Sequence, residues 1–281
     1  MVAMNESGYL MEQAVATQLE QRGIHVNTNV AFEDPDEGKS REMDVQGIQR
    51  VGYNEKEKLA AYVEYIIECK NSSNPLVFVA RPKHGADRNN APREFLFPFE
   101  YKMSKLAEVT KLTTYREVPA YRHLGFDKVF NETKIDWKAV QFCRIDRKGG
   151  GWHANHGGLY DATFFPMVKA FAARKKALDS MKAHRTDSVI WLFFPLVVTT
   201  SDLFLIDSSE PAPAPKLVDY ITFKRELRSA MLTGTFMLTF VHLKALEAFL
   251  ATVVDPMAKH ATDLIMNRTE FFRTQVIPWS D

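Results

Sequence analysis

The segment Ile66-Ile67-Glu68-Cys69-Lys70 places a carboxylate and an ammonium two residues apart at the end of an apolar, β-prone stretch. Residues two apart on a strand share a face, so Glu68 and Lys70 are expected on one face, roughly 6.6 Å apart along the strand. A strand this apolar rarely carries two opposite charges on one face without a use for them. The segment therefore predicts both a strand and a candidate site.

The residues before this segment predict a helix followed by an antiparallel meander. Residues 6–22 carry one helical stripe that includes Glu12, and Gly23 follows where a helix commonly ends. Strand-like stretches lie at 24–32, 42–53 and 60–70, separated by polar turns. On the second of these, Asp44 and Gln46 are expected to face away from Met43 and Val45. In a meander, Asp44 and Glu68 can then come close together.

The rest of the chain predicts a single α/β domain with a mixed sheet. Residues 71–98 contain four prolines and indicate a long loop or insertion, and a helix is expected near 99–113. A glycine-rich loop covers 148–158, a helix 162–183, and a hairpin 189–199 and 203–207. Strands near 217–224 and 235–242 and a helix over 243–260 follow. We therefore divide the chain into a core at 1–209, with an insertion at about 71–160, and a strand/helix extension at 210–281 packed on the same domain.

Composition sets the cellular context. The formal net charge is +1, so no field of the whole protein attracts nucleic acid, and any such binding must come from local patches. The two cysteines cannot make a disulfide framework, which favours a reducing cytoplasm. The first ten residues lack the features of a secretory signal, and the longest apolar run, 189–198, is about half of what a bilayer requires. We expect a cytoplasmic protein without a membrane partner.

The acidic residues suggest a metal site. Two neighbouring carboxylates repel each other, and a divalent cation between Asp44 and Glu68 would relieve this repulsion. All-oxygen ligation with water suits Mg²⁺ or Mn²⁺, which can polarise a phosphodiester and generate hydroxide. Glu12 points inward from its helix and needs a partner, because a buried unpaired charge is costly. Lys70 could orient or deprotonate the attacking water and stabilise charge on the phosphate.

These residues resemble a known family. Glu12, the REMD stretch ending at Asp44, and IIECK ending at Lys70 are similar to the motif of the PD-(D/E)XK nuclease superfamily, which includes restriction endonucleases, Holliday-junction resolvases and Mrr-like enzymes. The residue before Asp44 is Met43 rather than proline, which is a departure from the motif. The resemblance implies a restriction-endonuclease-like core of helix, three strands, helix and strand, completed by the helix at 162–183 and the strand at 189–198.

The resemblance also implies roles for individual residues. Asp44 and Glu68 would bind Mg²⁺ or Mn²⁺, Glu12 would support the metal from the helix, and Lys70 would be the catalytic lysine. The reaction would be hydrolysis of DNA phosphodiester bonds, in defence against foreign DNA or in DNA processing. The alternatives are an inactive nuclease-like module that binds nucleic acid or another partner, and an RNA-directed nuclease. A homodimer would supply the two active sites that double-strand cleavage usually needs.

Two basic segments are candidate nucleic-acid contacts. The glycine-rich loop carries Arg147 and Lys148, and its Trp152 could stack on a base, although a mobile surface loop would look the same. On the helix at 162–183, the run Arg174-Lys175-Lys176 could hold phosphates, although such runs are more often a solvated helix face. No element resembles a base-reading helix, so the sequence predicts no sequence specificity.

Overall fold

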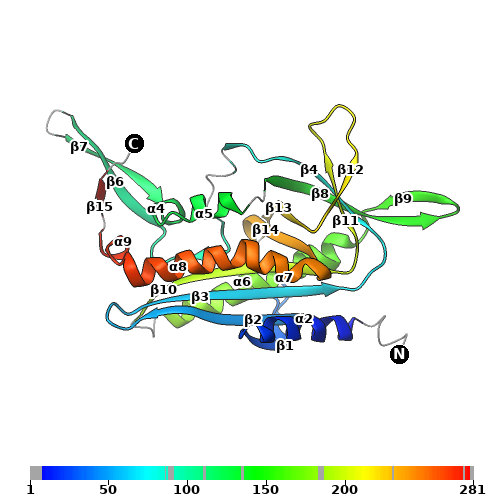
Figure 1. Cartoon of the computed structure of the whole chain (residues 1–281), viewed down its shortest axis with the longest axis horizontal. Helices are drawn as coiled ribbons and strands as arrows, with labels where there is room; N and C mark the ends of the chain where they lie inside the picture. Colours follow the sequence, from blue (N-terminus) through cyan, green and yellow to red (C-terminus); the bar gives the residue numbers. More distant parts are fainter. Residues whose placement is uncertain are drawn as a thin grey trace.

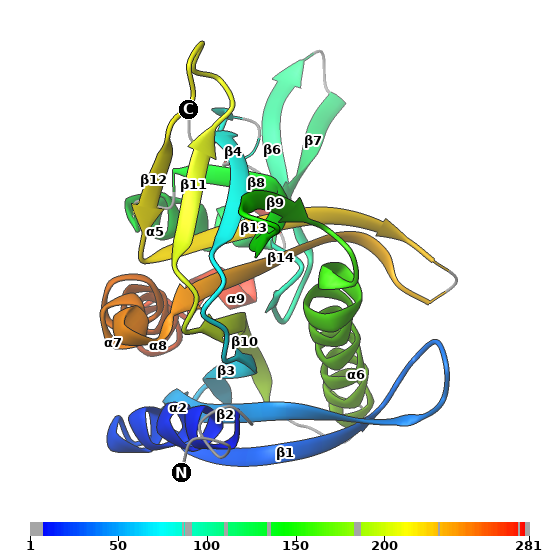
Figure 2. The ribbon, with the colours of Figure 1, turned by 90° about the vertical axis from the view of Figure 1, so that its right-hand side faces the viewer.

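The computed structural model describes residues 8–85, 87, 92–109, 112–133, 136–182, 187–229, 231–274 and 276–278. Within them, a 12-stranded mixed sheet runs through the molecule, and helices lie against it on both sides (Figures 1 and 2). Its strand order is β1-β2-β3-β10-β14-β13-β8-β4-β11-β12, with β5 paired to β10 and β9 paired to β8. The prediction of an α/β fold with a mixed sheet is therefore confirmed.

The N-terminal part is a helix followed by an antiparallel meander, as predicted. Helix α2 (Tyr9–Gln21) buries Val15 and Leu19 and ends before Gly23, whose φ of 74° lies in the left-handed region that favours glycine. Strands β1 (His25–Glu33), β2 (Ser40–Asn54) and β3 (Leu59–Lys70) then pair in sequence.

Strand β10 (Ser188–Thr199) lies beside β3 and runs parallel to it, with Thr199 opposite Lys70. Helix α6 (Phe165–Lys182), which directly follows the π-helical turn η1 (Tyr160–Phe164), precedes it. The helix and the strand expected here are therefore confirmed. The predicted hairpin with β11 (Leu203–Asp207) is wrong, because β10 pairs with β3 and β14, while β11 pairs with β4 and β12. An apolar strand buried on both faces is typical of a central parallel strand rather than of a hairpin.

Residues 71–160 contribute strands to the same sheet. Strand β4 (Leu76–Pro82) pairs with β8 (Trp137–Lys148), which returns as β9 (Gly151–Asn155), so the glycine-rich stretch is a hairpin rather than a loop. Three further elements of this range are short: β5 (Phe95–Leu96), α4 (Ala120–His123) and α5 (Phe126–Glu132).

The helix expected over 99–113 is wrong. The chain there forms the antiparallel hairpin of β6 (Tyr101–Val109) and β7 (Leu112–Pro119), which β15 (Val276–Pro278) extends; residues 110 and 111 lie outside the described part. The β-branched and aromatic residues along β7 favour a strand over a helix.

The C-terminal segment enters the sheet rather than capping it. Strand β12 (Pro215–Val218) pairs with β11, and strands β13 (Tyr220–Arg228) and β14 (Thr233–His242) pair with each other. Strand β14 also lies parallel to β10. A continuous helical region follows, made of η2 (Leu243–Ala245), α7 (Leu246–Phe249), η3 (Leu250–Val254) and α8 (Asp255–Asn267), then α9 (Glu270–Arg273). The strands and helix predicted for this segment are confirmed, with shifted ends.

Two apolar clusters fill the two faces of the sheet. Val15 of α2, Ile67 of β3 and Leu264 of α8 belong to the first, and Ile66 of β3 and Phe171 of α6 to the second. Neighbouring residues of β3 therefore serve opposite clusters, as strand alternation requires. Figure 2 shows α6 on one side of the sheet and α7 and α8 on the other. Among the described residues, no helix is both long enough and apolar enough to span a membrane.

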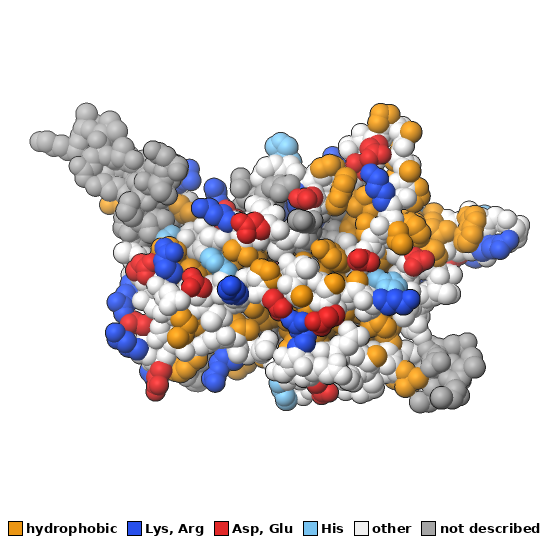
Figure 3. Space-filling view, in the orientation of Figure 1, with side chains coloured by type: hydrophobic (Ala, Val, Ile, Leu, Met, Phe, Trp, Pro, Cys, Tyr) orange, Lys and Arg blue, Asp and Glu red, His pale blue; other side chains and the backbone are white. Residues whose placement is uncertain are grey.

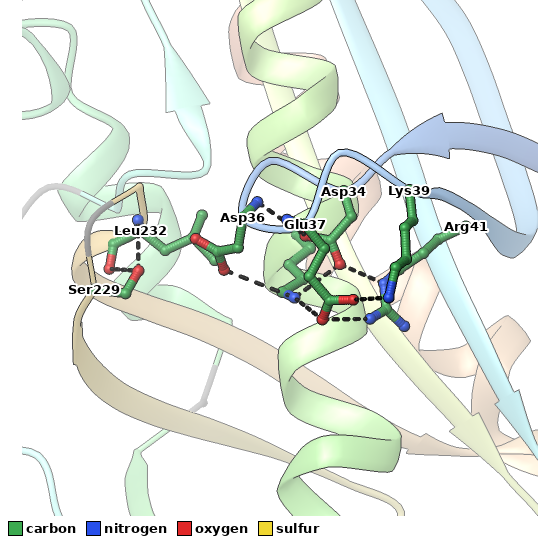
Figure 4. Close-up of polar contacts among 8 residues, drawn as sticks. Asp34, Asp36, Glu37, Lys39, Arg41, Ser229 and Leu232 are labelled. Carbon is green, nitrogen blue, oxygen red and sulfur yellow. Dashed lines mark hydrogen bonds and ion pairs between the residues drawn. The ribbon is translucent and has the colours of Figure 1, made fainter.

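A buried carboxylate fastens the β1–β2 turn to α6. Asp34 is completely buried and accepts hydrogen bonds from Lys169 Nζ at 2.8 Å, from the Asp36 N–H at 2.9 Å and from Arg41 Nε. Figure 4 shows this turn folded over the helix. Burial alone would raise the pKa of Asp34, but these donors hold it well below its ordinary value. The turn is thus held by charge as well as by packing.

Candidate active site

Strand β3 presents Glu68 and Lys70 on the same face, as predicted. Lys70 Nζ lies 2.6 Å from Glu68 Oε1, and the Lys70 side chain is 36% exposed while that of Glu68 is 12% exposed. The neighbouring strand fixes the end of β3, because the Lys70 carbonyl accepts hydrogen bonds from Thr199 Oγ1 at 2.9 Å and from the Thr200 N–H at 3.3 Å. The carboxylate is therefore largely withdrawn from water while the ammonium reaches it.

Strand β2 places Asp44 beside Glu68. The register pairs Val45 with Ile67, so Asp44 lies one step further along, next to Glu68. Asp44 Oδ2 accepts a hydrogen bond from the Cys69 N–H at 2.6 Å. The two carboxylates thus come from adjacent strands and share one end of the meander, which is the placement that the sequence predicted.

The faces of β2 reverse at Asp44. Met43 packs in the cluster under α6, whereas Val45 packs in the cluster under α2 and α8, so the prediction that these two residues share a face is wrong. On the neighbouring strand, Thr28 pairs with Val45 and Val30 with Met43, and Asn29 between them has a φ of 52°. A non-glycine residue in this region is uncommon and marks a local distortion of the strand. The distortion lies directly beside Asp44.

Helix α2 brings Glu12 to the same place. Glu12 is half-buried, at the margin of the face that buries Val15. Burial and the nearby Asp44 raise the pKa of Glu12, and a hydrogen bond to the Asn29 side chain opposes the rise. The sequence contains no signal for Asn29, because its contact depends on an unusual backbone conformation.

Burial and nearby carboxyl groups disfavour the ionisation of all three acids, with Asp44 acting on Glu12 and Glu68, and Glu42 acting on Asp44. Burial raises the pKa of Glu68, and Asp44 and Glu12 add to the rise against the opposing effect of Lys70. Burial likewise raises the pKa of Asp44, although the Cys69 N–H and Lys70 partly oppose it. Half-buried acids that repel each other beside a single ammonium are unfavourable in the isolated protein. A bound cation would relieve this cost.

The donor set fits a hydrated Mg²⁺ or Mn²⁺ ion. Among the described residues, no three Asp, Glu, His or Cys side chains are arranged closely enough to enclose a metal ion. Mg²⁺ does not require such an arrangement, because it usually keeps several waters and is bound through one or two carboxylates together with substrate phosphates. Asp44 and Glu68 would supply these carboxylates, with Glu12 nearby.

The predicted nucleic-acid residues lie in two different settings. Arg147, Lys148 and Trp152 are on the β8–β9 hairpin, where Trp152 is 69% exposed and the Arg147 guanidinium lies 6.0 Å from the centre of its ring. Midway along the hairpin, Asp146 accepts a hydrogen bond from Asn74 Nδ2 at 2.9 Å, which ties the hairpin to the loop after Lys70.

The three basic residues of α6 do not share that setting. Arg174 is bound to the buried Glu64, with Nε 2.6 Å and Nη2 3.0 Å from its two carboxylate oxygens. Lys175 is half-buried, and burial lowers its pKa, whereas Lys176 is exposed. The guanidinium of Arg174 is therefore already bound to Glu64. A phosphate contact at this helix stays a prediction, and the exposed Lys176 is the residue best placed for it.

Comparison with known proteins gives no relative. No family model, no curated protein and no solved structure matches the chain. Function must therefore be inferred from the site itself.

Proposed function

We propose that this chain is a metal-dependent nuclease of the PD-(D/E)XK type that hydrolyses phosphodiester bonds of DNA. The observation that carries this proposal is the meeting of Glu12, Asp44, Glu68 and Lys70 at one end of the sheet. The pKa of each of the three carboxyl groups is raised there. Perturbed ionisable groups that gather at one place are typical of catalytic sites.

The order of elements around the site supports the proposal. A helix (α2), three antiparallel strands (β1 to β3), a helix (α6) and a strand (β10) occur in this order, with the elements of residues 71–160 inserted between β3 and α6 and with β10 parallel to β3. This is the order that the resemblance to the PD-(D/E)XK superfamily implies. The candidate residues lie on the first helix and on the second and third strands, as that resemblance requires.

The side chains have distinct roles in hydrolysis, which adds water across a P–O bond of the backbone. When bound, Mg²⁺ or Mn²⁺ would polarise the phosphodiester and lower the pKa of a water molecule. Asp44 and Glu68 would hold the ion, and Glu12 would supply further negative charge. The Lys70 ammonium orients the attacking water and stabilises the negative charge that develops on the phosphate.

The β8–β9 hairpin supplies a surface for the nucleic acid. Figure 1 shows it projecting from the end of the molecule toward which β3 points, and Figure 3 shows hydrophobic and basic side chains together on this projection. Trp152 can stack on a base, and Arg147 and Lys148 can neutralise phosphates. Contacts of this kind hold a strand in place without reading its sequence.

The test is cleavage of supercoiled and linear DNA with Mg²⁺, with Mn²⁺ or with EDTA. We expect metal-dependent cutting that Lys70→Ala reduces by about 10²–10³-fold, the usual cost of removing one group that stabilises developing negative charge. Lys56→Ala is the matched control, since Lys56 is an exposed lysine in the β2–β3 turn at the other end of β3, and it should cut normally.

Failure of the wild-type protein to cut DNA or RNA with either metal would overturn the proposal. Binding of nucleic acid that needs no metal and survives Glu68→Ala and Lys70→Ala would instead support an inactive nuclease-like module. Cutting of RNA alone would keep the chemistry and change the substrate.

A further inference from the structure

A polar cavity lies at the other end of β4 from the candidate active site. Its volume is about 480 Å³, within the range of small-molecule sites, and it opens between α5, the base of the β6–β7 hairpin and the starts of β8 and β14. Strand β4 begins six residues after Lys70, and Lys83 of the cavity directly follows it. Seven residues of extended strand span roughly 23 Å, so an occupant of the cavity would not touch the catalytic groups.

The lining carries excess positive charge. The charged residues that line it are four basic ones and two acids: Lys83, Arg93, Lys138, Lys224, Asp87 and Glu94. This leaves a surplus of two positive charges even when both acids are ionised. Lys138 Nζ lies 2.6 Å from both oxygens of Asp87, so this pair is internally neutral. Lys224, from β13, is half-buried. Half-buried cations in a concave site favour an anionic ligand.

The second acid, Glu94, is buried in the wall of the cavity. Glu94 is 2% exposed and accepts a hydrogen bond from the Met237 N–H at 2.8 Å. Burial raises its pKa to about 7, against the opposing effects of that hydrogen bond, Lys175 and Arg93. At the floor of the cavity, Glu94 thus offers a polar group that can exchange hydrogen bonds with a ligand.

Aromatic rings form much of the remaining wall. Trp137 and Phe130 are half-buried, Tyr121 is buried and Tyr101 is 54% exposed at the rim. The Lys83 ammonium lies 5.0 Å from the centre of the Phe130 ring, so cation and ring are already adjacent. Flat apolar walls beside cations favour a ligand that joins a planar ring to negative charge.

We propose that this cavity is a second ligand site, which binds a free nucleotide with its base among Trp137, Phe130 and Tyr121 and its phosphates on Lys224 and the neighbouring basic residues. Aromatic stacking and basic side chains are the usual means of holding a base and a phosphate. The inference is independent of the nuclease chemistry, because none of the cavity residues belongs to the acidic cluster.

Calorimetric titration of the full chain with each of the four ribonucleoside triphosphates tests this assignment. EDTA is present throughout, so that a metal at the acidic cluster cannot contribute to binding. We expect saturable binding of at least one triphosphate, weakened by about tenfold in Lys224→Ala through loss of a charge-assisted contact and restored in Lys224→Arg. Trp137→Ala should weaken binding as well, and Trp137→Phe should keep most of it.

Two lysine variants serve as controls. Lys56→Ala removes an exposed lysine elsewhere, and Lys70→Ala removes the catalytic lysine; both should bind the nucleotide as the wild type does. Thermal unfolding of each variant checks that it is folded. If an alanine variant does not fold, the conservative Lys224→Arg and Trp137→Phe variants still test the assignment.

Several results would overturn the assignment. One is that none of the four nucleotides saturates the protein. Another is that Lys224→Ala and Trp137→Ala both bind as tightly as the wild type. A third is that Lys70→Ala loses binding. Tripolyphosphate binding as tightly as the nucleotides would also overturn it, since the base would then contribute nothing. So would binding of a single-stranded oligonucleotide without binding of any free nucleotide.

Discussion

Glu64 and Glu68 lie on the same face of β3, four residues apart, and their surroundings are opposite in kind. Glu64 is completely buried and accepts hydrogen bonds from Arg174, from Trp191 Nε1 at 3.0 Å and from Gln46 Nε2 at 2.7 Å. Glu68 is less buried, pairs with Lys70 and lies near two other carboxyl groups. The fold satisfies the first carboxylate and leaves the second with like charges around it.

The difference shows that burial alone does not identify a functional acid. A buried carboxylate with a complete set of donors stabilises the fold, because removing it would leave those donors without partners. A carboxylate that shares a site with other carboxylates costs stability unless a cation binds. Sites that break the rules of stable packing in this way are commonly functional.

The largest expected effect separates these two acids by stability. Glu64→Gln should lower the free energy of unfolding by about 3 kcal/mol, because it leaves the Arg174 charge without its partner. Glu68→Gln, measured without metal, should change it by less than about 1 kcal/mol or raise it, since it removes repulsion. Urea denaturation of the two variants beside the wild type measures both values. If Glu68→Gln loses as much free energy of unfolding as Glu64→Gln, the two acids do not differ in how they contribute to stability.

Asp34 extends the comparison to a third buried carboxylate and to pH. Its folded pKa lies below its ordinary value, so its stabilising contribution is complete above about pH 4 and is lost as the pH falls toward the folded pKa. Asp34→Asn should therefore cost about 2 kcal/mol near neutral pH and less in acid. Urea midpoints between about pH 6 and pH 3 measure this slope.

Asp202→Asn is the control for Asp34, because Asp202 is an exposed aspartate in the turn before β11. It should leave both the midpoint and its pH dependence unchanged. A parallel shift of the Asp34→Asn curve at every pH would show that the carboxylate charge is not what holds the turn to α6.

The acidic cluster should respond to pH with the opposite sign. The pKa values of Glu12, Asp44 and Glu68 are raised, so protons compete with Mg²⁺ at a higher pH than at ordinary carboxylates. Below the highest of these values, affinity for Mg²⁺ should fall by about tenfold for each pH unit when one proton competes. Without metal, stability should fall as the pH rises through the same window, because the folded chain binds these protons more tightly than the unfolded chain.

Calorimetric titration with Mg²⁺ at about pH 5.5, 6.5 and 7.5 measures this competition. Asp44→Asn should bind Mg²⁺ more weakly at neutral pH and show a smaller dependence on pH. If the affinity of the wild type for Mg²⁺ does not change over this pH range, the acidic cluster is not the site that binds the metal.

The sequence predicted those parts of the molecule that depend on local pattern. The α2 stripe, the meander and the Glu68–Lys70 spacing follow from helical and strand periods, and all were placed correctly. The pairing of β10 depends on which distant segments lie beside it, and a single sequence does not contain that information. The β6–β7 hairpin joins neighbouring segments, and there the predicted helix was wrong because the β-branched and aromatic residues of β7 favour a strand. Sequence singled out Glu68 by its spacing to Lys70, but it could not show that Glu64 is paired, since only the fold brings Arg174 to it.

The smallest expected effect concerns Asn29, where the backbone distortion meets the acidic cluster. Asn29→Gly keeps the left-handed φ without strain but removes the amide that opposes the raised pKa of Glu12. Stability should change by less than about 0.5 kcal/mol, and affinity for Mg²⁺ near pH 6.5 should fall by about threefold, the equivalent of one weak hydrogen bond. Asn29→Ala should in addition lose about 1 kcal/mol of stability, because alanine disfavours this φ. If the glycine variant binds Mg²⁺ as the wild type does while the alanine variant binds it weakly, Asn29 matters for the shape of β1 and not for the charge of Glu12.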